Sequence, residues 1–466
     1  MRFKLPINKQ LLVIAFQKPY DIATLEGRSL ERRRRIALTA LTSTILRILT
    51  MAIPLITLKI TFNYLNAEVY GLWSAVTTFF ALFAFSDLGL GNGLQTKLSQ
   101  ANGKDDIVLS KKIISNTYTI LLAVAVLLFV IFIGFYSFVD WATFMNAKSN
   151  ETMILASSVV FVIVVPKILS IPVAIIRRTQ LALQEGYRSD IWSIAGVCIN
   201  LILIVVIAKL DLGKITLLAS TSLLPVIVSI INMFVYFNFQ RKEMKFSLKL
   251  FDYEMSKSLL SLGILFSFLS ILTTIGLSMD TFIVAKTSSL AEAGSYSIIY
   301  RVSAIFSAVV GILSAPLWGA NGEALARGDY KWVKSNTRRM SLIMVSISSF
   351  LVIIALLSAK IIFRVWMGSN FEFSYPALFW LSIMQILLSF ISPYFMVLNA
   401  YGIVKLQILL FAIYTPISFV LKYYVSMSYG VATIPMIGAI AYLFIIVFGT
   451  YYFSNKKLNI ENIEYE

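Results

Sequence analysis

Four charged residues interrupt long apolar stretches of the sequence: Arg47, Lys167, Asp280 and Arg301. A charged side chain at the centre of a bilayer costs at least about 2.5–3.5 kcal/mol, so such residues usually serve a function. With about 1.5 Å of rise per helical residue, Arg47 and Lys167 are expected roughly 17 and 14 Å from one membrane face. Asp280 and Arg301 are expected roughly 9 and 12 Å from the other face. Three of these four residues are cations and one is a carboxylate. This excess of positive charge predicts a cavity that binds an anionic ligand and binds a cationic drug poorly.

The carboxylates and the remaining cation leave alternatives open. Asp280 and Arg301 lie at similar depth, which fits either an ion pair or a site for a coupling ion, H⁺ or Na⁺. Asp87 lies at a membrane boundary, where it either caps a helix, pairs with loop cations or takes part in the same coupling. Lys422, near the end of a later apolar stretch, is expected to extend its ammonium group to the lipid head groups.

Several aromatic residues near these charges are candidates for stacking against sugar rings. At helix ends, aromatic side chains also form the belts that mark the membrane interface, so both roles stay open. The candidates are Tyr70, Trp73, Tyr296 and Tyr300.

The elements that must position these side chains are membrane-spanning helices. Of the 466 residues, 58% are apolar and 14% are charged, with a mean hydropathy of +0.82, whereas soluble domains have about 25% charged residues. Apolar stretches of about 18 residues or more can cross a bilayer core of about 30 Å. The sequence predicts an all-α, polytopic membrane protein with twelve spans, near residues 36–58, 69–90, 113–137, 153–176, 191–208, 215–238, 258–285, 293–320, 340–358, 375–398, 406–425 and 431–453.

The composition excludes several kinds of chemistry. The sequence contains no histidine, which excludes imidazole catalysis and imidazole metal ligation, and its single cysteine, Cys198, cannot form an intrachain disulfide. The net charge of +17 reflects basic cytoplasmic loops and contact with anionic lipid, not nucleic-acid binding. We therefore predict no metal site, no cofactor and no enzymatic activity.

The basic residues also predict the topology. Lys and Arg concentrate in alternate connections between the predicted spans, from Arg32–Arg35 to Lys456 and Lys457. Because cytoplasmic loops carry the excess of basic residues, both termini are expected in the cytoplasm. The predicted divisions are a cytoplasmic segment (1–35), a six-helix lobe (36–240), a linker (241–257), a second six-helix lobe (258–453) and a cytoplasmic tail (454–466).

The two predicted lobes resemble each other in sequence. Tyr70 and Tyr296, and likewise Ala101 and Ala326, occupy matching places and are separated by nearly half the chain. With this offset, the first predicted span corresponds to the seventh, and both cross the membrane in the same direction. Parallel repeats of this kind are a known transporter architecture, with the substrate site between the halves.

Two short motifs resemble those of a known family. The segment Ser86–Gly93 (SDLGLGNG) resembles a motif of bacterial polysaccharide and O-antigen flippases, and Asp280–Val284 followed by Ala293–Tyr296 is similar to that family's seventh-to-eighth helix junction. The resemblance implies the fold of the multidrug/oligosaccharidyl-lipid/polysaccharide exporter superfamily, with two lobes around a central cavity. It also implies an undecaprenyl-pyrophosphate-linked sugar substrate of lipopolysaccharide or capsule synthesis, with a polysaccharide polymerase and a chain-length regulator as partners.

These observations together predict a flippase in the bacterial inner membrane. Arg47, Lys167 and Arg301 would bind the anionic head group of the lipid-linked oligosaccharide in the cavity while the lobes rock to expose it outside. A cation-coupled multidrug exporter of the same fold is the first alternative. A polytopic polymerase or glycosyltransferase is the second, although such enzymes generally need a large external loop or a carboxylate cluster.

Overall fold

The computed structural model describes residues 17, 20, 25–81, 89–326, 330–368, 371, 373–401 and 403–465. The described residues are almost entirely helical and contain no strand. Nine of their helices are long and apolar enough to cross a membrane, or ten if a bent pair, Ser267–Ser278 with Asp280–Thr287, forms one span. The prediction of an all-α, polytopic membrane protein is confirmed. Asp87 and the first three residues of the Ser86–Gly93 motif lie outside the described residues.

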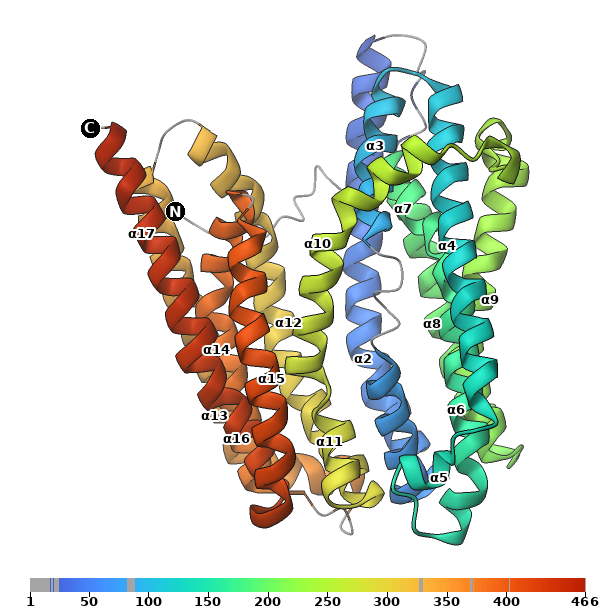
Figure 1. Ribbon diagram of the computed structural model, residues 1–466, viewed down its shortest axis with the longest axis vertical. Coiled ribbons are helices and arrows are strands. Elements are labelled where there is room, and N and C mark those ends of the chain that lie inside the picture. Colours follow the sequence, from blue (N-terminus) through green and yellow to red (C-terminus); the bar gives the residue numbers. More distant parts are fainter. Residues whose placement is uncertain are drawn as a thin grey trace. The chain divides into compact units, whose positions relative to one another are not determined.

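The helices of the described residues are labelled in Figure 1, and the predicted apolar stretches fall on them as far as they are described. In the N-terminal part, these are α2 (Leu25–Phe79), α3 (Leu90–Gly103), α4 (Ile107–Tyr136), the short α5 (Trp141–Phe144), α6 (Asn150–Val173), α7 (Ile175–Ala182), α8 (Gly186–Lys209) and α9 (Lys214–Val235). The short turns η2 (Tyr236–Gln240), η3 (Lys242–Met244) and η4 (Leu248–Leu250) follow. The C-terminal part consists of α10 (Tyr253–Ser278), α11 (Asp280–Thr287), α12 (Leu290–Ala326), α13 (Tyr330–Met367), α14 (Tyr375–Ala400), α15 (Val404–Tyr429), α16 (Thr433–Ala441), η5 (Tyr442–Val447) and α17 (Phe448–Tyr465).

The long helix α2 contains two of the predicted stretches, separated by a break at Asn66. Asn66 has φ 66° and ψ 169°, which is not helical. Its side-chain oxygen accepts a hydrogen bond from the backbone N–H of Val69 at 3.0 Å, the contact by which an asparagine caps the start of a helix. Asn66 therefore ends one helical segment and caps the next.

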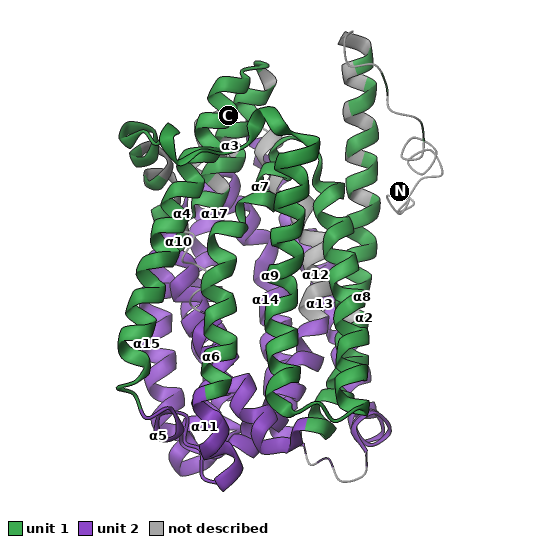
Figure 2. Ribbon diagram, turned by 90° about the vertical axis from the view of Figure 1, so that its right-hand side faces the viewer, with its two compact units in different colours: residues 1–64, 83–139, 158–267 green, residues 65–82, 140–157, 268–466 purple. Residues whose placement is uncertain are grey.

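The chain forms two compact units (Figure 2). Unit 1 comprises the described residues of Met1–Tyr64, Phe83–Val139 and Ser158–Ser267, and unit 2 those of Leu65–Leu82, Asp140–Ser157 and Phe268–Glu466. The units differ from the predicted lobes because two N-terminal segments, 65–82 and 140–157, pack with the C-terminal helices. The predicted linker, 241–257, belongs to unit 1.

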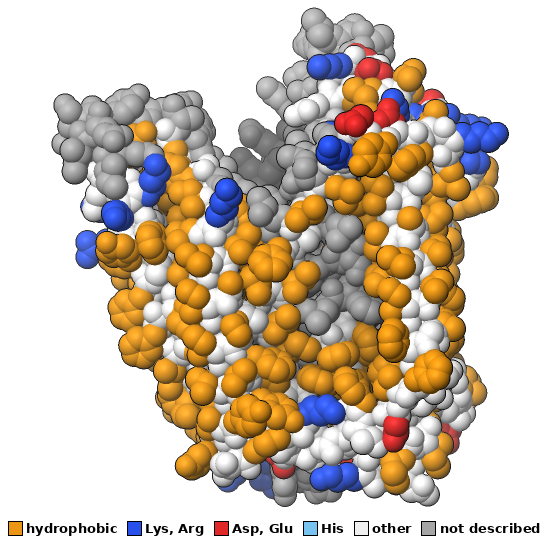
Figure 3. All heavy atoms as spheres, viewed as in Figure 1, with side chains coloured by type: hydrophobic (Ala, Val, Ile, Leu, Met, Phe, Trp, Pro, Cys, Tyr) orange, Lys and Arg blue, Asp and Glu red, His pale blue; other side chains and the backbone are white. Residues whose placement is uncertain are grey.

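In both units, large apolar side chains point outward along the helices. On α4, for example, Val126, Val130 and Phe135 are more than half exposed. The space-filling view shows apolar side chains over most of the visible surface and charged ones mainly toward the ends of the helices (Figure 3). This is the pattern of a protein solvated by lipid along its sides and by water at its ends.

We call the end of each unit with most of its basic residues the basic end, and the other the opposite end. In unit 1 the basic end carries Arg34, Arg35, Arg188 and Arg241, and in unit 2 it carries Lys334 and Arg338.

The segment 65–82 packs closely on α12 within unit 2. A Cβ atom added to Gly71 would lie 1.6 Å from the carbonyl oxygen of Leu290, and one added to Gly294 would lie 2.6 Å from the carbonyl oxygen of Ala67. The hydroxyl of Ser297 donates to that of Ser74 at 3.1 Å. Only glycine permits two helix backbones to approach this closely, so this glycine pair sets the contact.

Candidate functional site

A pocket in unit 1 is enclosed by helices α3, α4, α6, α7, α8 and α9. Its volume is about 630 Å³, within the range of small-molecule sites. Arg177 and Arg178 line it together with Trp192 and a set of serines, and no acidic residue is among its lining residues that the structure describes. The two guanidinium groups therefore give the pocket a positive potential.

The serines of the pocket present acceptor oxygens. The hydroxyl of Ser193 donates to the carbonyl oxygen of Ser189 at 2.9 Å, that of Ser229 to Pro225 at 2.8 Å and that of Ser170 to Lys167 at 2.6 Å. Because each hydroxyl proton is used within its own helix, the oxygen lone pairs remain for a ligand that donates hydrogen bonds. Sugar hydroxyls are donors of this kind, and the indole of Trp192 offers a flat apolar face.

Buried polar residues hold the walls of this pocket in place. The amides of Gln180 on α7 and Asn232 on α9 bond to each other at 2.9 and 3.2 Å, and both side chains are buried. A guanidinium nitrogen of Arg178 donates to the side-chain oxygen of Gln95 on α3 at 3.3 Å. These contacts fix α3, α7 and α9 around the pocket.

The two predicted cations of the N-terminal half both belong to unit 1. Lys167 lies on α6 one turn from Ser170 and on the same helical face as Ala174, which lines the pocket. Arg47 lies on α2 one turn from Ser43 and is exposed. Among the described residues, neither side chain forms an ion pair. Both cations are thus open to an anionic ligand.

Helix α2 is joined to α8 beside this pocket. The carboxylate of Asp190 accepts hydrogen bonds from the hydroxyls of Thr42, at 3.0 Å, and Ser43. Ser189 and Ser193, on the same helix as Asp190, line the pocket. Arg47 follows Ser43 on α2 by about one helical turn, so it lies roughly 6 Å along the helix from this contact.

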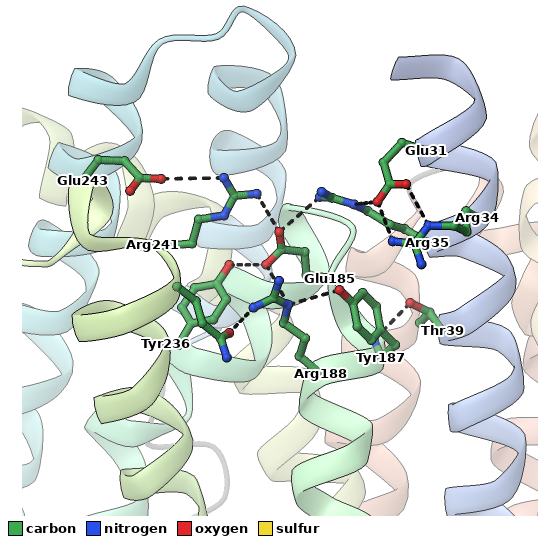
Figure 4. A network of polar contacts seen from close by, with 11 residues as sticks. Glu31, Arg34, Arg35, Thr39, Glu185, Tyr187, Arg188, Tyr236, Arg241 and Glu243 are labelled. Carbon is green, nitrogen blue, oxygen red and sulfur yellow. Dashed lines mark hydrogen bonds and ion pairs between the residues drawn. The ribbon is translucent and has the colours of Figure 1, made fainter. Parts of the chain in front are cut away.

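A buried carboxylate holds the basic end of unit 1 together (Figure 4). Glu185, which is 1% exposed, lies between α7 and α8 and accepts from Arg35 at 3.1 Å and from Arg241 at 2.6 Å. The hydroxyl of Tyr236 donates to its other oxygen at 2.9 Å, and Arg188 lies 3.4 Å away. Glu185 therefore joins α2, α8 and η2 just beyond the pocket.

In unit 2, Asp280 is paired with Lys422 and not with Arg301. The ammonium nitrogen of Lys422 lies 2.6 Å from Oδ1 of Asp280 and donates to the carbonyl oxygen of Gly276 at 3.0 Å. The hydroxyl of Tyr296 donates to Oδ2 at 3.0 Å. Lys422 is 2% exposed, so the expectation that it reaches the lipid head groups is wrong. The attraction of its ammonium group to Asp280 outweighs the hydration that it would gain at the membrane surface.

The pair lies beside a small cavity of about 200 Å³, lined also by Tyr300, Gln385 and Tyr414. Since Asp280 already has a cation and a hydroxyl as partners, it is neutralised by the protein itself. A coupling ion at Asp280 would have to displace Lys422.

The fourth predicted charge, Arg301, is exposed and lies over an aromatic ring. Its guanidinium carbon is 5.9 Å from the centre of the Trp73 ring, which in turn packs edge-on against Tyr70 at 5.3 Å. Tyr70 and Tyr296 are each 1% exposed, so neither can stack on a sugar in this structure. Of the four aromatic candidates, Trp73 and Tyr300 retain partial exposure.

Sequence reasoning missed the pocket residues of unit 1. Arg177 and Arg178 follow an apolar stretch, where basic residues usually mark a loop, but the chain continues as α7 and directs them to the pocket. A single serine carries little signal, because serine is common in membrane helices. The available signal was the spacing of Ser189 and Ser193, one turn apart on α8.

Several solved structures of membrane transporters share this fold. An inward-facing structure of a multidrug resistance MATE family transporter of the MOP superfamily matches with a TM-score of 0.73 and 15% identity, over 90% of this chain and 98% of that one. An outward-facing structure of such a transporter matches with a TM-score of 0.64 and 14% identity, over 92% and 96%. A MOP superfamily transporter from Pyrococcus furiosus, whose binding pocket of reverse polarity suggests a different function, matches with a TM-score of 0.66 and 15% identity, over 92% and 96%.

The chain is therefore a polytopic membrane protein with the MATE-like fold, as predicted. It belongs to the polysaccharide biosynthesis protein family, whose profile matches residues 39–316, well over half of the chain. Comparison with curated proteins finds no match.

Proposed function

We propose that the protein is a flippase that moves an undecaprenyl-pyrophosphate-linked oligosaccharide, an O-antigen or capsule repeat unit, from the cytoplasmic to the periplasmic leaflet. The observation that carries the proposal is the pocket of unit 1, in which Arg177 and Arg178 adjoin acceptor hydroxyls and Trp192. Guanidinium groups bind phosphate oxygens through paired hydrogen bonds. A ligand with phosphate at one end and sugar hydroxyls at the other fits this set of groups, and membership of a polysaccharide biosynthesis family supports it.

The charge balance of unit 1 favours an anionic ligand over a cationic drug. Its buried carboxylates Glu31, Glu185 and Asp190 are all occupied by protein donors. Lys167, one turn from Ser170 of the pocket, and Arg47, one turn from the Ser43–Asp190 contact, add positive charge to unit 1. Among the described buried residues of unit 1, a cationic substrate would approach these cations with no carboxylate left over to receive it.

We place the basic end in the cytoplasm of an inner-membrane protein, with both termini on that side, because basic residues mark cytoplasmic loops. The pyrophosphate group carries about two negative charges, and each is worth about 2.3 kcal/mol per 100 mV. Outward transfer is then favoured by a membrane potential that is negative inside. This driving force requires no ion at Asp280.

The test is transport by the purified protein in liposomes. A labelled polyprenyl-pyrophosphate oligosaccharide is incorporated, and its transfer between leaflets is scored by enzymatic access from outside. Wild-type protein should transfer it, whereas Arg177→Gln/Arg178→Gln and Lys167→Ala should slow transfer at least tenfold. Lys209→Gln, which removes an exposed cation from the opposite end of α8, is the matched control and should transfer normally.

Two outcomes would contradict the proposal. Transfer by Arg177→Gln/Arg178→Gln at the wild-type rate would show that the pocket does not bind the substrate. Uptake of a cationic dye by the same liposomes, without transfer of the lipid-linked sugar, would instead identify a multidrug exporter.

A further inference from the structure

A second cation-rich pocket lies at the basic end of unit 2, between α13 and α17. Its volume is about 610 Å³, and its cations are Lys331, Lys334, Arg338 and Arg339. No acidic side chain occurs among the pocket's lining residues in the described part of the chain. The pocket therefore gathers several positive charges in one place.

The packing of α13 holds these cations in position. Val333, on the buried side of the helix, forms an apolar cluster with Val397 of α14 and Leu458 of α17, and all three are at most 1% exposed. The hydroxyl of Ser341 donates to the carbonyl oxygen of Phe390 at 2.7 Å. Since α13 is fixed on both neighbours, its cations are presented at defined places.

One of the cations also connects the two walls. The ammonium nitrogen of Lys334 donates to the side-chain oxygen of Asn459 on α17 at 2.7 Å. Leu342, about one turn beyond Arg339 on α13, and Leu458, beside Asn459 on α17, supply apolar lining. The pocket thus combines a basic part with apolar side chains.

The pocket lies at the level expected for lipid head groups. Helix α13 has 38 residues, which corresponds to about 57 Å, far more than a bilayer core of about 30 Å. The apolar stretch of α13 begins directly after Arg339. The cations are therefore at the membrane surface, and Leu342 is at the level where acyl chains begin.

We propose that this pocket binds the phosphate group of an anionic membrane phospholipid, with the cations of α13 on the phosphate oxygens and Leu342 against an acyl chain. Basic pockets between membrane helices on the cytoplasmic side bind anionic head groups, and the paired donors of Arg338 and Arg339 match phosphate oxygens. In place of the tryptophan and four serines of the unit 1 pocket, the described lining of this one has Tyr330 and the single serine Ser335, beside four cations. The ligand is accordingly a lipid phosphate and not a sugar, and the site is independent of the transported substrate.

Native mass spectrometry of the full-length, delipidated protein in neutral detergent tests the proposal. The protein is titrated separately with phosphatidylglycerol, phosphatidylcholine and inorganic pyrophosphate. The variant Lys334→Gln/Arg338→Gln removes two cations from the pocket. Lys242→Gln/Lys249→Gln removes two exposed cations from unit 1 and is the matched control.

Wild-type protein and the control should bind phosphatidylglycerol at least tenfold more tightly than phosphatidylcholine, and Lys334→Gln/Arg338→Gln should lose this preference. The charge-conserving Lys334→Arg/Arg338→Lys should stay within about threefold of the wild type. If Lys334→Gln/Arg338→Gln does not fold, Lys331→Gln/Arg339→Gln serves for the same comparison. Unchanged binding by the neutralised pocket, or equal binding of phosphatidylcholine, would overturn the proposal. Displacement of phosphatidylglycerol by pyrophosphate at equal concentration would identify a site for free phosphates instead.

Discussion

The ammonium group of Lys422 on α15 and the carboxylate of Asp280 on α11 form an ion pair at 2.6 Å in the interior of unit 2. Both side chains are almost fully buried, so the pair is shielded from water and salt. Two charges that are each costly in a membrane become tolerable when they meet, provided that their remaining bonds are satisfied. The carbonyl oxygen of Gly276 and the hydroxyl of Tyr296 satisfy two of those bonds.

Breaking this pair from either side should destabilise the protein. In Lys422→Met the carboxylate of Asp280 is left buried without its cation, and removing one partner of a buried pair typically costs about 3–5 kcal/mol. The double variant Asp280→Asn/Lys422→Met leaves no charge behind and should recover part of that loss. Thermal unfolding of the purified variants in detergent measures both effects.

The exposed cation Lys360 on α13 provides the control. Lys360→Met should change the unfolding midpoint very little, because exposed substitutions are usually within about 0.5 kcal/mol. If the losses of the two single variants simply add in the double variant, Asp280 and Lys422 are not energetically coupled.

Asn116 on α4 anchors the 241–257 linker to unit 1. Its amide nitrogen donates to the carbonyl oxygen of Leu250 at 3.0 Å, and its oxygen accepts from the backbone N–H of Asp252 at 2.6 Å and from the hydroxyl of Ser256 at 3.1 Å. Asn116 is fully buried. Asn116→Leu would remove the partner of the Leu250 carbonyl group and of the Asp252 N–H, at a cost of about 1–3 kcal/mol, and should speed tryptic cleavage of the linker.

A neighbouring ion pair is the control for this prediction. Lys112 lies 2.6 Å from Asp252, but both side chains are about one-third exposed, and exposed pairs contribute at most about 1 kcal/mol. Lys112→Gln should therefore leave the cleavage rate nearly unchanged. Equal cleavage rates for Asn116→Leu and Lys112→Gln would show that the amide does not hold the linker.

The helices could be predicted because hydropathy is a local property of the sequence. The break at Asn66 falls in the gap between two predicted stretches, and each later stretch falls on a described helix. The partner of Asp280 could not be predicted, because it depends on how α11 packs against α15. Asp280 and Lys422 are 142 residues apart in the sequence. Depth along a span identifies which charges are level, but not which helices are neighbours.

The pocket of unit 1 escaped prediction for a related reason. It depends on where α6 ends, at Val173 after Pro172, and on α7 continuing from there. Because the helix continues past Pro172, Arg177 and Arg178 reach the same space as Ser193 of α8. The sequence identifies a proline in a span, but whether the helix continues beyond it depends on packing.

Glu31 should make the stability of the basic end of unit 1 depend on pH. Arg34 donates twice to its carboxylate at 2.7 Å, and Arg35 donates at 2.9 Å. The hydrogen bonds from Arg34 lower the pKa of Glu31 from 4.5 to about 2. Because the pKa is lower in the folded protein, the stabilisation is complete above pH 4.5 and is lost as the pH falls toward 2.

The comparison of wild type with Glu31→Gln tests this pH dependence. Hydrogen bonds to charged groups contribute about 1.5–3 kcal/mol, so Glu31→Gln should unfold at a lower temperature at pH 7. The difference should shrink between pH 5 and pH 2. Glu243→Gln, which removes an exposed carboxylate 3.6 Å from Arg241, should differ little from wild type throughout. A gap between wild type and Glu31→Gln that stays constant down to pH 2 would contradict the assignment.

The glycine contact between segment 65–82 and α12 can be tested by cross-linking. The hydroxyls of Ser74 and Ser297 are 3.1 Å apart, so cysteines at these positions, in a Cys198→Ser background, should form a disulfide under mild oxidation. Adding Gly71→Leu should reduce cross-linking at least tenfold, because the new side chain would enter the space of the Leu290 carbonyl group. Gly134→Leu is the matched control, since no atom lies within 4 Å of a Cβ at that position. Cross-linking of the Gly71→Leu protein at the control rate would show that this close approach does not depend on the glycine. If the contact must open during transport, the disulfide should also stop transfer of the lipid-linked sugar, and reduction should restore it.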